Sequence, residues 1–125
     1  MNVVDASAWL EYFADGPNAA FFAPAIEATG ELVVPSMVLH KVFRRILQER
    51  SEGEALQAAA IMHQGRLVDL DGPLALAAAK LSAEAKLPTG ESIVLATARR
   101  HGAVLWTQEK DLEGHPDVRY RARRR

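Results

Sequence analysis

Acidic side chains follow two short apolar runs of the sequence, at the point where each run ends. Asp5 follows residues 2–4, and Glu109 and Asp111 follow residues 103–106. If both runs are neighbouring strands of a parallel sheet, their carboxyl ends share one edge and three carboxylates converge there. Two such acids repel by roughly 4 kcal/mol at about 4 Å and an effective dielectric constant near 20. A compensating cation is therefore expected, and oxygen ligands favour Mg²⁺ or Mn²⁺, which suit phosphodiester hydrolysis.

Glu91 is a fourth candidate, in the first turn of a helix expected over residues 89–101. Its neighbours three, four and seven residues on are apolar: Val94, Leu95 and Ala98. This spacing places the Glu91 carboxylate on the inward stripe, near the positive end of the helix dipole. Each acid taken alone has a simpler explanation, because Asp5 can be a helix N-cap and the others solvated surface acids. Only the joint pattern favours a site.

Strand-like and helix-like segments alternate along the whole chain, and these are the elements that must position the acids. We expect strands at residues 2–4, 32–34, 66–70, 103–106 and 117–122, and helices at about 5–13, 18–29, 36–50, 51–64, 73–86 and 89–101. Strands that alternate with helices of ten or more residues predict an α/β fold, with a mainly parallel sheet of four to five strands covered on both faces.

The composition is that of a globular domain. The chain has 125 residues, of which 49% are apolar and 25% charged, so we exclude disorder as its main state. No apolar run reaches the length of a membrane span, and no basic region precedes the first apolar run as in a secretory signal. The absence of cysteine excludes thiolate zinc sites and permits a reducing cytoplasm, which is our expectation. The histidines lack zinc-ligand spacing: His40, His63, His101 and His115.

The charge is distributed unevenly. Residues 119–125 read RYRARRR, with five arginines and no acid. Without these arginines 10 basic and 16 acidic residues remain, so residues 1–118 carry a formal charge of −6. We therefore predict a single domain over residues 1–118 and a basic C-terminal tail over 119–125. The tail either binds RNA phosphates, pairs with an acidic partner or is a solubilising terminus. The arginines predicted to bind RNA are Arg119, Arg121, Arg123 and Arg124.

Several segments resemble a known family. Residues 3–10 (VVDASAWL) resemble the opening of PIN-domain proteins, especially the VapC-type toxins of bacterial toxin–antitoxin pairs. Residues 87–98 resemble their late helix, with Glu91 where an aspartate is usual. Residues 103–112 resemble their closing strand and turn, with Glu109 in place of an aspartate and Asp111 matching. The segment 32–35 and the helix after it fit as well, so the resemblance spans almost the whole chain.

The resemblance implies a three-layer α/β/α sandwich and metal-dependent RNA cleavage. It makes Asp5 and Glu91 the ligands of Mg²⁺ or Mn²⁺, and Glu109 and Asp111 the acids that complete or orient the shell. These four acids would form the catalytic set, supported by Thr107 and Ser7. The resemblance also implies an antitoxin protein as partner, and a homodimer.

Lys41 departs from the family pattern, because a glutamate is usual at its position. If Lys41 faces the acids, its ammonium can neutralise Asp5 or Glu91 in place of a metal, which it cannot bind while protonated. If it lies with Met37, Arg44 and Gln48 on the outer stripe of its helix, it is a solvated residue. The first case leads to an alternative function, a catalytically degenerate PIN-like module that binds protein or RNA. Glu91 and Glu109 are also one methylene longer than aspartate, which disturbs the geometry that Mg²⁺ requires.

A phospho-receiver domain is a third class that fits the length of the chain. It would use an acid after the first strand, a hydroxyl such as Thr107 and a lysine. Receivers carry paired acids after the first strand, whereas Asp5 stands alone, so this class is the weakest of the three.

Overall fold

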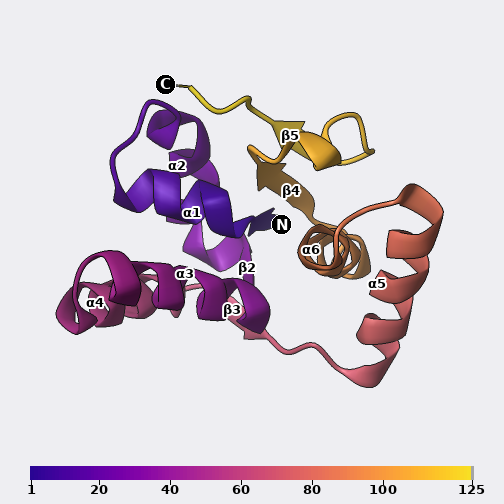
Figure 1. Cartoon of the computed structure of the whole chain (residues 1–125), viewed down its shortest axis with the longest axis horizontal. Helices are drawn as coiled ribbons and strands as arrows, with labels where there is room; N and C mark the ends of the chain where they lie inside the picture. The colour runs from indigo at the N-terminus through magenta and orange to yellow at the C-terminus, as the bar shows by residue number, and fades with distance from the viewer. Residues whose placement is uncertain (125) are drawn as a thin grey trace.

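The computed structural model describes residues 1–124 and contains one five-stranded sheet (Figure 1). All neighbouring strands are parallel, and their order is β3-β2-β1-β4-β5. The strands are β1 (Asn2–Val4), β2 (Leu32–Pro35), β3 (Arg66–Val68), β4 (Val104–Thr107) and β5 (Val118–Tyr120). The last residue of the predicted tail, Arg125, lies outside the described residues.

Six α-helices of the described chain flank this sheet. They are α1 (Ala6–Phe13), α2 (Ala19–Glu27), α3 (Ser36–Glu49), α4 (Glu52–Met62), α5 (Gly72–Ala85) and α6 (Thr89–Arg100). In Figure 1, α1 and α2 lie on one side of β1 and β4, whereas α6 lies on the other side with α5 packed outside it. The α/β fold with a parallel sheet between helical layers is therefore confirmed. Among residues 1–124, no helix combines the length and the hydropathy that a membrane crossing needs.

The elements form where local sequence favours them. All four residues of β2 are buried, as are the last three of β4, which is the burial expected of parallel strands covered on both faces. Side chains at the N-cap positions accept backbone N–H groups, as Ser51 does for α4 and Asp71 for α5. The helix α6 begins at Thr89 as predicted, and Pro88 stands at its N-cap without a side-chain acceptor.

The strand order places the acid-bearing strands side by side. β1 pairs with β4 in parallel, with Val3 opposite Leu105 and Val4 opposite Trp106. The chain winds from β1 outward to β3 and then returns to the other side of β1, so β1 and β4 flank the topological switch point, where α/β sheets bind ligands. A receiver-type sheet has the order 2-1-3-4-5, so the observed order removes the phospho-receiver alternative.

Candidate active site

Asp5 is placed at the floor of the site by the end of β1. Its backbone N–H donates to the carbonyl of Trp106 (3.0 Å), which continues the pairing of β1 with β4. Its side chain caps α1, because Oδ1 accepts the N–H of Ala6 (2.8 Å). Oδ2 accepts the hydroxyl of Thr107 (2.9 Å). A carboxylate has about four acceptor positions, so Asp5 keeps acceptor capacity for a further ligand.

The surroundings of Asp5 oppose its negative charge. Asp5 is 5% exposed, and burial raises its pKa from 3.8 to about 6. The hydrogen bonds from Thr107 and Ala6 lower this pKa, whereas the charges of Glu109 and Glu91 raise it. Lys41 is not among the groups that shift this pKa. The negative charges of Glu109 and Glu91 thus act on Asp5, whereas Asp111 is not among the charges that raise its pKa.

Thr107 connects the two acid-bearing strand ends. It is fully buried at the end of β4, where its Oγ1 donates to Asp5 and accepts the backbone N–H of Glu109 (2.9 Å). One hydroxyl therefore fixes both the Asp5 carboxylate and the start of the loop that carries Glu109. A β-branched side chain has few rotamers, so this bridge is rigid.

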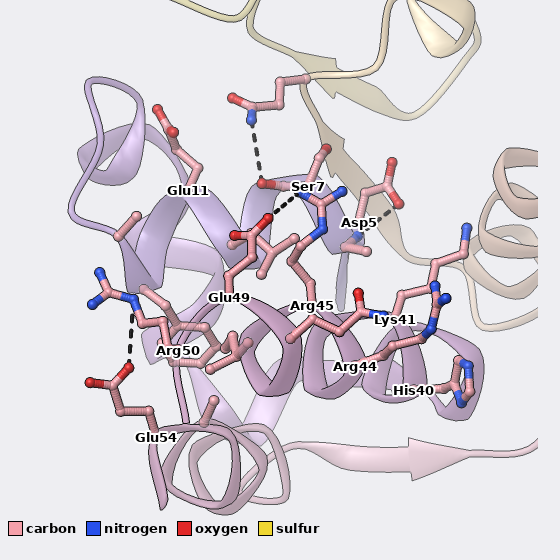
Figure 2. A pocket seen from close by; sticks show the side chains of 18 of the residues that line it. Asp5, Ser7, Glu11, His40, Lys41, Arg44, Arg45, Glu49, Arg50 and Glu54 are labelled. Carbon is pink, nitrogen blue, oxygen red and sulfur yellow. Dashed lines mark hydrogen bonds and ion pairs between the residues drawn. The ribbon is translucent and has the colours of Figure 1, made fainter. Parts of the chain in front are cut away.

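A cavity of about 920 Å³ brings most of the predicted residues together. Asp5, Ser7, Glu91 and Glu109 line it, and α1, α3 and α4 form much of its wall. Figure 2 shows Asp5 and Ser7 on the α1 side and a row of basic side chains rising from α3 below them. The cavity thus has the buried carboxylate of Asp5 at one end and exposed basic side chains along one wall.

Lys41 belongs to this cavity although its side chain is exposed. A Cβ added to Gly90 would lie 2.3 Å from the Lys41 Nζ, so the ammonium rests against the first turn of α6, one residue before Glu91. Lys41 is exposed on α3, and its side chain reaches the first turn of α6. Among the described residues it forms no ion pair with Asp5 or Glu91, so both predicted orientations stay predictions.

Asp111 does not line the cavity that holds the other three acids. It is exposed in a 3₁₀ turn (Lys110–Leu112). The buried Leu112 anchors this turn in the core. The predicted role of Asp111 stays a prediction.

The arginines of the C-terminal segment take different places. The guanidinium of Arg119 lies over the ring of Trp106 (4.9 Å), and that of Arg121 over Phe21 (4.4 Å). Arg123 instead forms an ion pair with Glu109 and lines the cavity. Arg124 is exposed. Among these four, Arg123 is therefore the arginine that reaches the acidic set.

Sequence reasoning missed polar residues that complete the site. Arg44 lines the cavity and lies one helical turn after Lys41, a spacing that is visible in the sequence. Asn18 and Gln108 are both buried, and Asn18 Nδ2 donates to Gln108 Oε1 (3.1 Å). Gln108 Nε2 in turn donates to the carbonyl of Ser7 (3.3 Å). No local pattern pairs residues 18 and 108, because only the fold brings them together.

The donor set fits a hydrated divalent cation. Among residues 1–124, no three His, Cys, Asp or Glu side chains are close enough to chelate one ion together. Mg²⁺ is commonly held by one or two carboxylates and keeps several waters, so Asp5 together with one glutamate of the same cavity would suffice. The Ser7 Oγ is buried without a hydrogen-bond partner in the described structure, and it is a suitable acceptor or donor for such a water.

The PIN domain model matches residues 3–117, so the chain belongs to the PIN domain family. Comparison with curated protein sequences found no match.

Solved structures share this fold. A toxin–antitoxin complex from Klebsiella pneumoniae contains a chain with a TM-score of 0.78 and 23% identity, over 94% of this chain and 95% of that chain. VapBC2 from Rickettsia felis, bound to promoter DNA, gives a TM-score of 0.73 and 10% identity, over 97% of both chains. VapC20 from Mycobacterium tuberculosis, a toxin that cleaves the sarcin–ricin loop, gives 0.70 and 16%, over 90% of this chain and 92% of that chain.

Proposed function

We propose that this chain is a divalent-metal-dependent endoribonuclease and the toxin of a toxin–antitoxin pair. The observation that carries the proposal is the convergence of Asp5, Glu91 and Glu109 on one cavity at the switch point of the sheet. Membership of the PIN domain family supports it, and so does the likeness in fold to a toxin that cleaves the sarcin–ricin loop.

The chain's own residues provide a route for RNA into the cavity. Lys41 and Arg44 line it from α3, and neither takes part in the ion pairs of the described residues. Figure 2 shows both side chains extending from the α3 wall at the end of the cavity where Asp5 lies. Exposed cations that are not paired with acids attract phosphates, so the substrate backbone would lie along α3 with one phosphate near Asp5.

Asp5 and Glu91 would hold the metal, and Glu109, which lines the same cavity, would orient its hydration shell. Thr107 and the N–H of Ala6 hold the Asp5 carboxylate in one orientation and leave it acceptor positions that a metal ion could use. When bound, Mg²⁺ or Mn²⁺ supplies activation of water and neutralisation of phosphate charge. Asp111 is proposed from the family resemblance, and Asp111→Asn measures its part separately.

The experiment is cleavage of labelled RNA by the purified chain with Mg²⁺ or Mn²⁺, with and without excess chelator. The matched variant is Asp5→Asn, which keeps the size of the side chain and its acceptor for the Ala6 N–H. We expect the chelator to abolish cleavage and Asp5→Asn to reduce it by more than about a hundredfold, since even supporting residues of metal sites account for tenfold to a hundredfold. Cleavage that persists unchanged in excess chelator would overturn the proposal.

The second candidate is the catalytically degenerate module. It is favoured by the position of the Lys41 ammonium against the first turn of α6, close in sequence to Glu91. The geometry offers no direct support for neutralisation, because among the described residues Lys41 forms no ion pair with Asp5 or Glu91. Calorimetry with Mn²⁺ separates the two, since the degenerate module predicts no binding by wild type and binding by Lys41→Glu.

The proposed partners are RNA, an antitoxin protein and a second copy of the chain. The antitoxin is supported by the Klebsiella pneumoniae structure, a toxin–antitoxin complex of the same fold. A short open reading frame beside the gene, whose product co-purifies with this chain and blocks its cleavage of RNA, is the expected result. Analytical ultracentrifugation of the chain alone tests the homodimer.

A further inference from the structure

Residues 121–124, the C-terminal arm, are docked on the domain by interior groups. The N–H of Arg121 donates to the carbonyl of Thr107 (3.0 Å), which continues the pairing of β4 with β5. The carbonyl of Ala122 accepts from Asn18 Nδ2 (2.9 Å), and Asn18 is 1% exposed. The same Nδ2 group donates to Gln108. The arm is therefore placed by directed hydrogen bonds as well as by its charge.

This docking places the positively charged guanidinium of Arg123 at the candidate active site. Arg123 follows the anchored Ala122 directly, and its guanidinium donates to the Glu109 carboxylate. The Glu109 side chain is 28% exposed and that of Arg123 58%, so the pair lies at the solvent side of the cavity that both residues line. A guanidinium does not lose its proton in proteins, so Arg123 stays charged at every accessible pH. Arg123 thus occupies one carboxylate oxygen, Oε1, of an acid proposed above to complete the metal site.

We propose that Arg123 is a positioning residue that competes with the divalent cation for the Glu109 carboxylate, so that cation binding and docking of the C-terminal arm oppose each other. This inference rests on the proposed function. A guanidinium and a divalent cation use the same carboxylate oxygens, and their positive charges repel at short range. By thermodynamic linkage, the cation loosens the arm by the same factor by which the arm weakens the cation.

The first test is titration calorimetry of the full chain with MnCl₂. We expect Arg123→Ala to bind Mn²⁺ about fivefold more tightly than wild type, a modest factor because the ion pair is partly exposed. Arg123→Lys keeps the competing charge and should stay within about twofold of wild type. Arg119→Ala is the matched control, because it removes an arginine that lies over Trp106 and not at Glu109, and its affinity should not change. Equal affinities of wild type and Arg123→Ala would overturn the competition.

The second test follows the arm itself by limited digestion with trypsin. Mn²⁺ should accelerate cleavage after Arg121 in wild type, because the undocked arm is more accessible, and intact mass measures the product. The same ion should have no effect on Asp5→Asn, which controls for direct effects on the protease. A wild-type chain that binds Mn²⁺ without any change in cleavage after Arg121 contradicts the inference.

The outcomes separate this inference from the proposed function. Metal-dependent RNA cleavage together with equal Mn²⁺ affinities of wild type and Arg123→Ala leaves the nuclease standing and removes the competition. Mn²⁺ binding by Arg123→Ala but not by wild type supports the competition in its strongest form. Binding by neither protein, at any concentration up to millimolar, removes both.

Discussion

Replacing Asp5 by asparagine measures the electrostatic cost of the site in the absence of any ligand. Folding raises the pKa of Asp5 from 3.8 to about 6. The native state therefore binds more protons than the unfolded chain between these pH values, and the free energy of unfolding falls as the pH rises through them. Since a tenfold change in proton affinity is about 1.4 kcal/mol, the full cost above pH 6 is about 3 kcal/mol.

The asparagine of the Asp5→Asn variant does not titrate, so the pH dependence of stability that Asp5 causes should disappear. Its amide keeps an acceptor for the Ala6 N–H but gives up the hydrogen bond from the Thr107 hydroxyl, at a cost of about 1 kcal/mol. At pH 7 the variant should be more stable than wild type by about 2 kcal/mol. Near pH 4, where Asp5 is protonated in the folded protein, this gain should vanish.

The assay is urea unfolding of both proteins at pH 4 and pH 7, with chelator present throughout. Between these pH values the stability of wild type relative to Asp5→Asn should change by about 2 kcal/mol. Asp111→Asn, which neutralises an exposed acid of the neighbouring turn, is the control and should keep the wild-type pH dependence. Parallel pH profiles for wild type and Asp5→Asn would refute the electrostatic reasoning, whatever the absolute stabilities are.

Three further predictions concern single residues. Thr107→Val should raise the pKa of Asp5 above about 6, because the hydrogen bond from the Thr107 hydroxyl lowers that pKa in wild type. An NMR titration of the Asp5 carboxyl that shows no rise would contradict this. Gly65→Ala should lower the free energy of unfolding in urea by about 1–3 kcal/mol, since its Cβ would lie 2.9 Å from Leu32 Cγ. The control Gly53→Ala should raise it by up to about 1 kcal/mol, because its Cβ would meet only Ser51 Oγ, at 3.9 Å. Lys86→Gly should stabilise the chain by about 1 kcal/mol, because Lys86 caps the C-terminus of α5 with a left-handed φ of 55°, which glycine adopts without strain. An unchanged or lower midpoint of thermal unfolding would contradict this.

The convergence of Asp5, Thr107 and Glu109 could be predicted because it depends on a general property of parallel sheets. Residues that follow β1 and β4 meet once these strands are neighbours, and helical crossovers make a parallel arrangement the expected one. Glu91 could be placed from the spacing of apolar residues in its helix. Asp111 could not be placed, because a short turn directs its side chains by local backbone angles that composition does not reveal.

The position of the C-terminal arm was beyond sequence reasoning for a different physical reason. A run of arginines indicates charge, but their places depend on the ring of Phe21 and on the buried Asn18, both distant in sequence. Lys41 shows the same limit on a smaller scale. Helical spacing assigns it to a face of α3, whereas the reach of its side chain to Gly90 depends on where α6 packs.

The hydrogen bond from Thr107 to Asp5 spans 102 positions of the chain, and this has a consequence for folding. Contacts of such separation carry a large loop-closure entropy, so the β1–β4 pair is expected to be a late and slow step. During synthesis, the edge of β1 that pairs with β4 stays unpaired until β4 has been made. Until then the nascent chain also lacks Thr107 and Glu109. The candidate site is therefore complete only when the fold closes, and a prematurely terminated product would lack it and be prone to aggregate along that open edge.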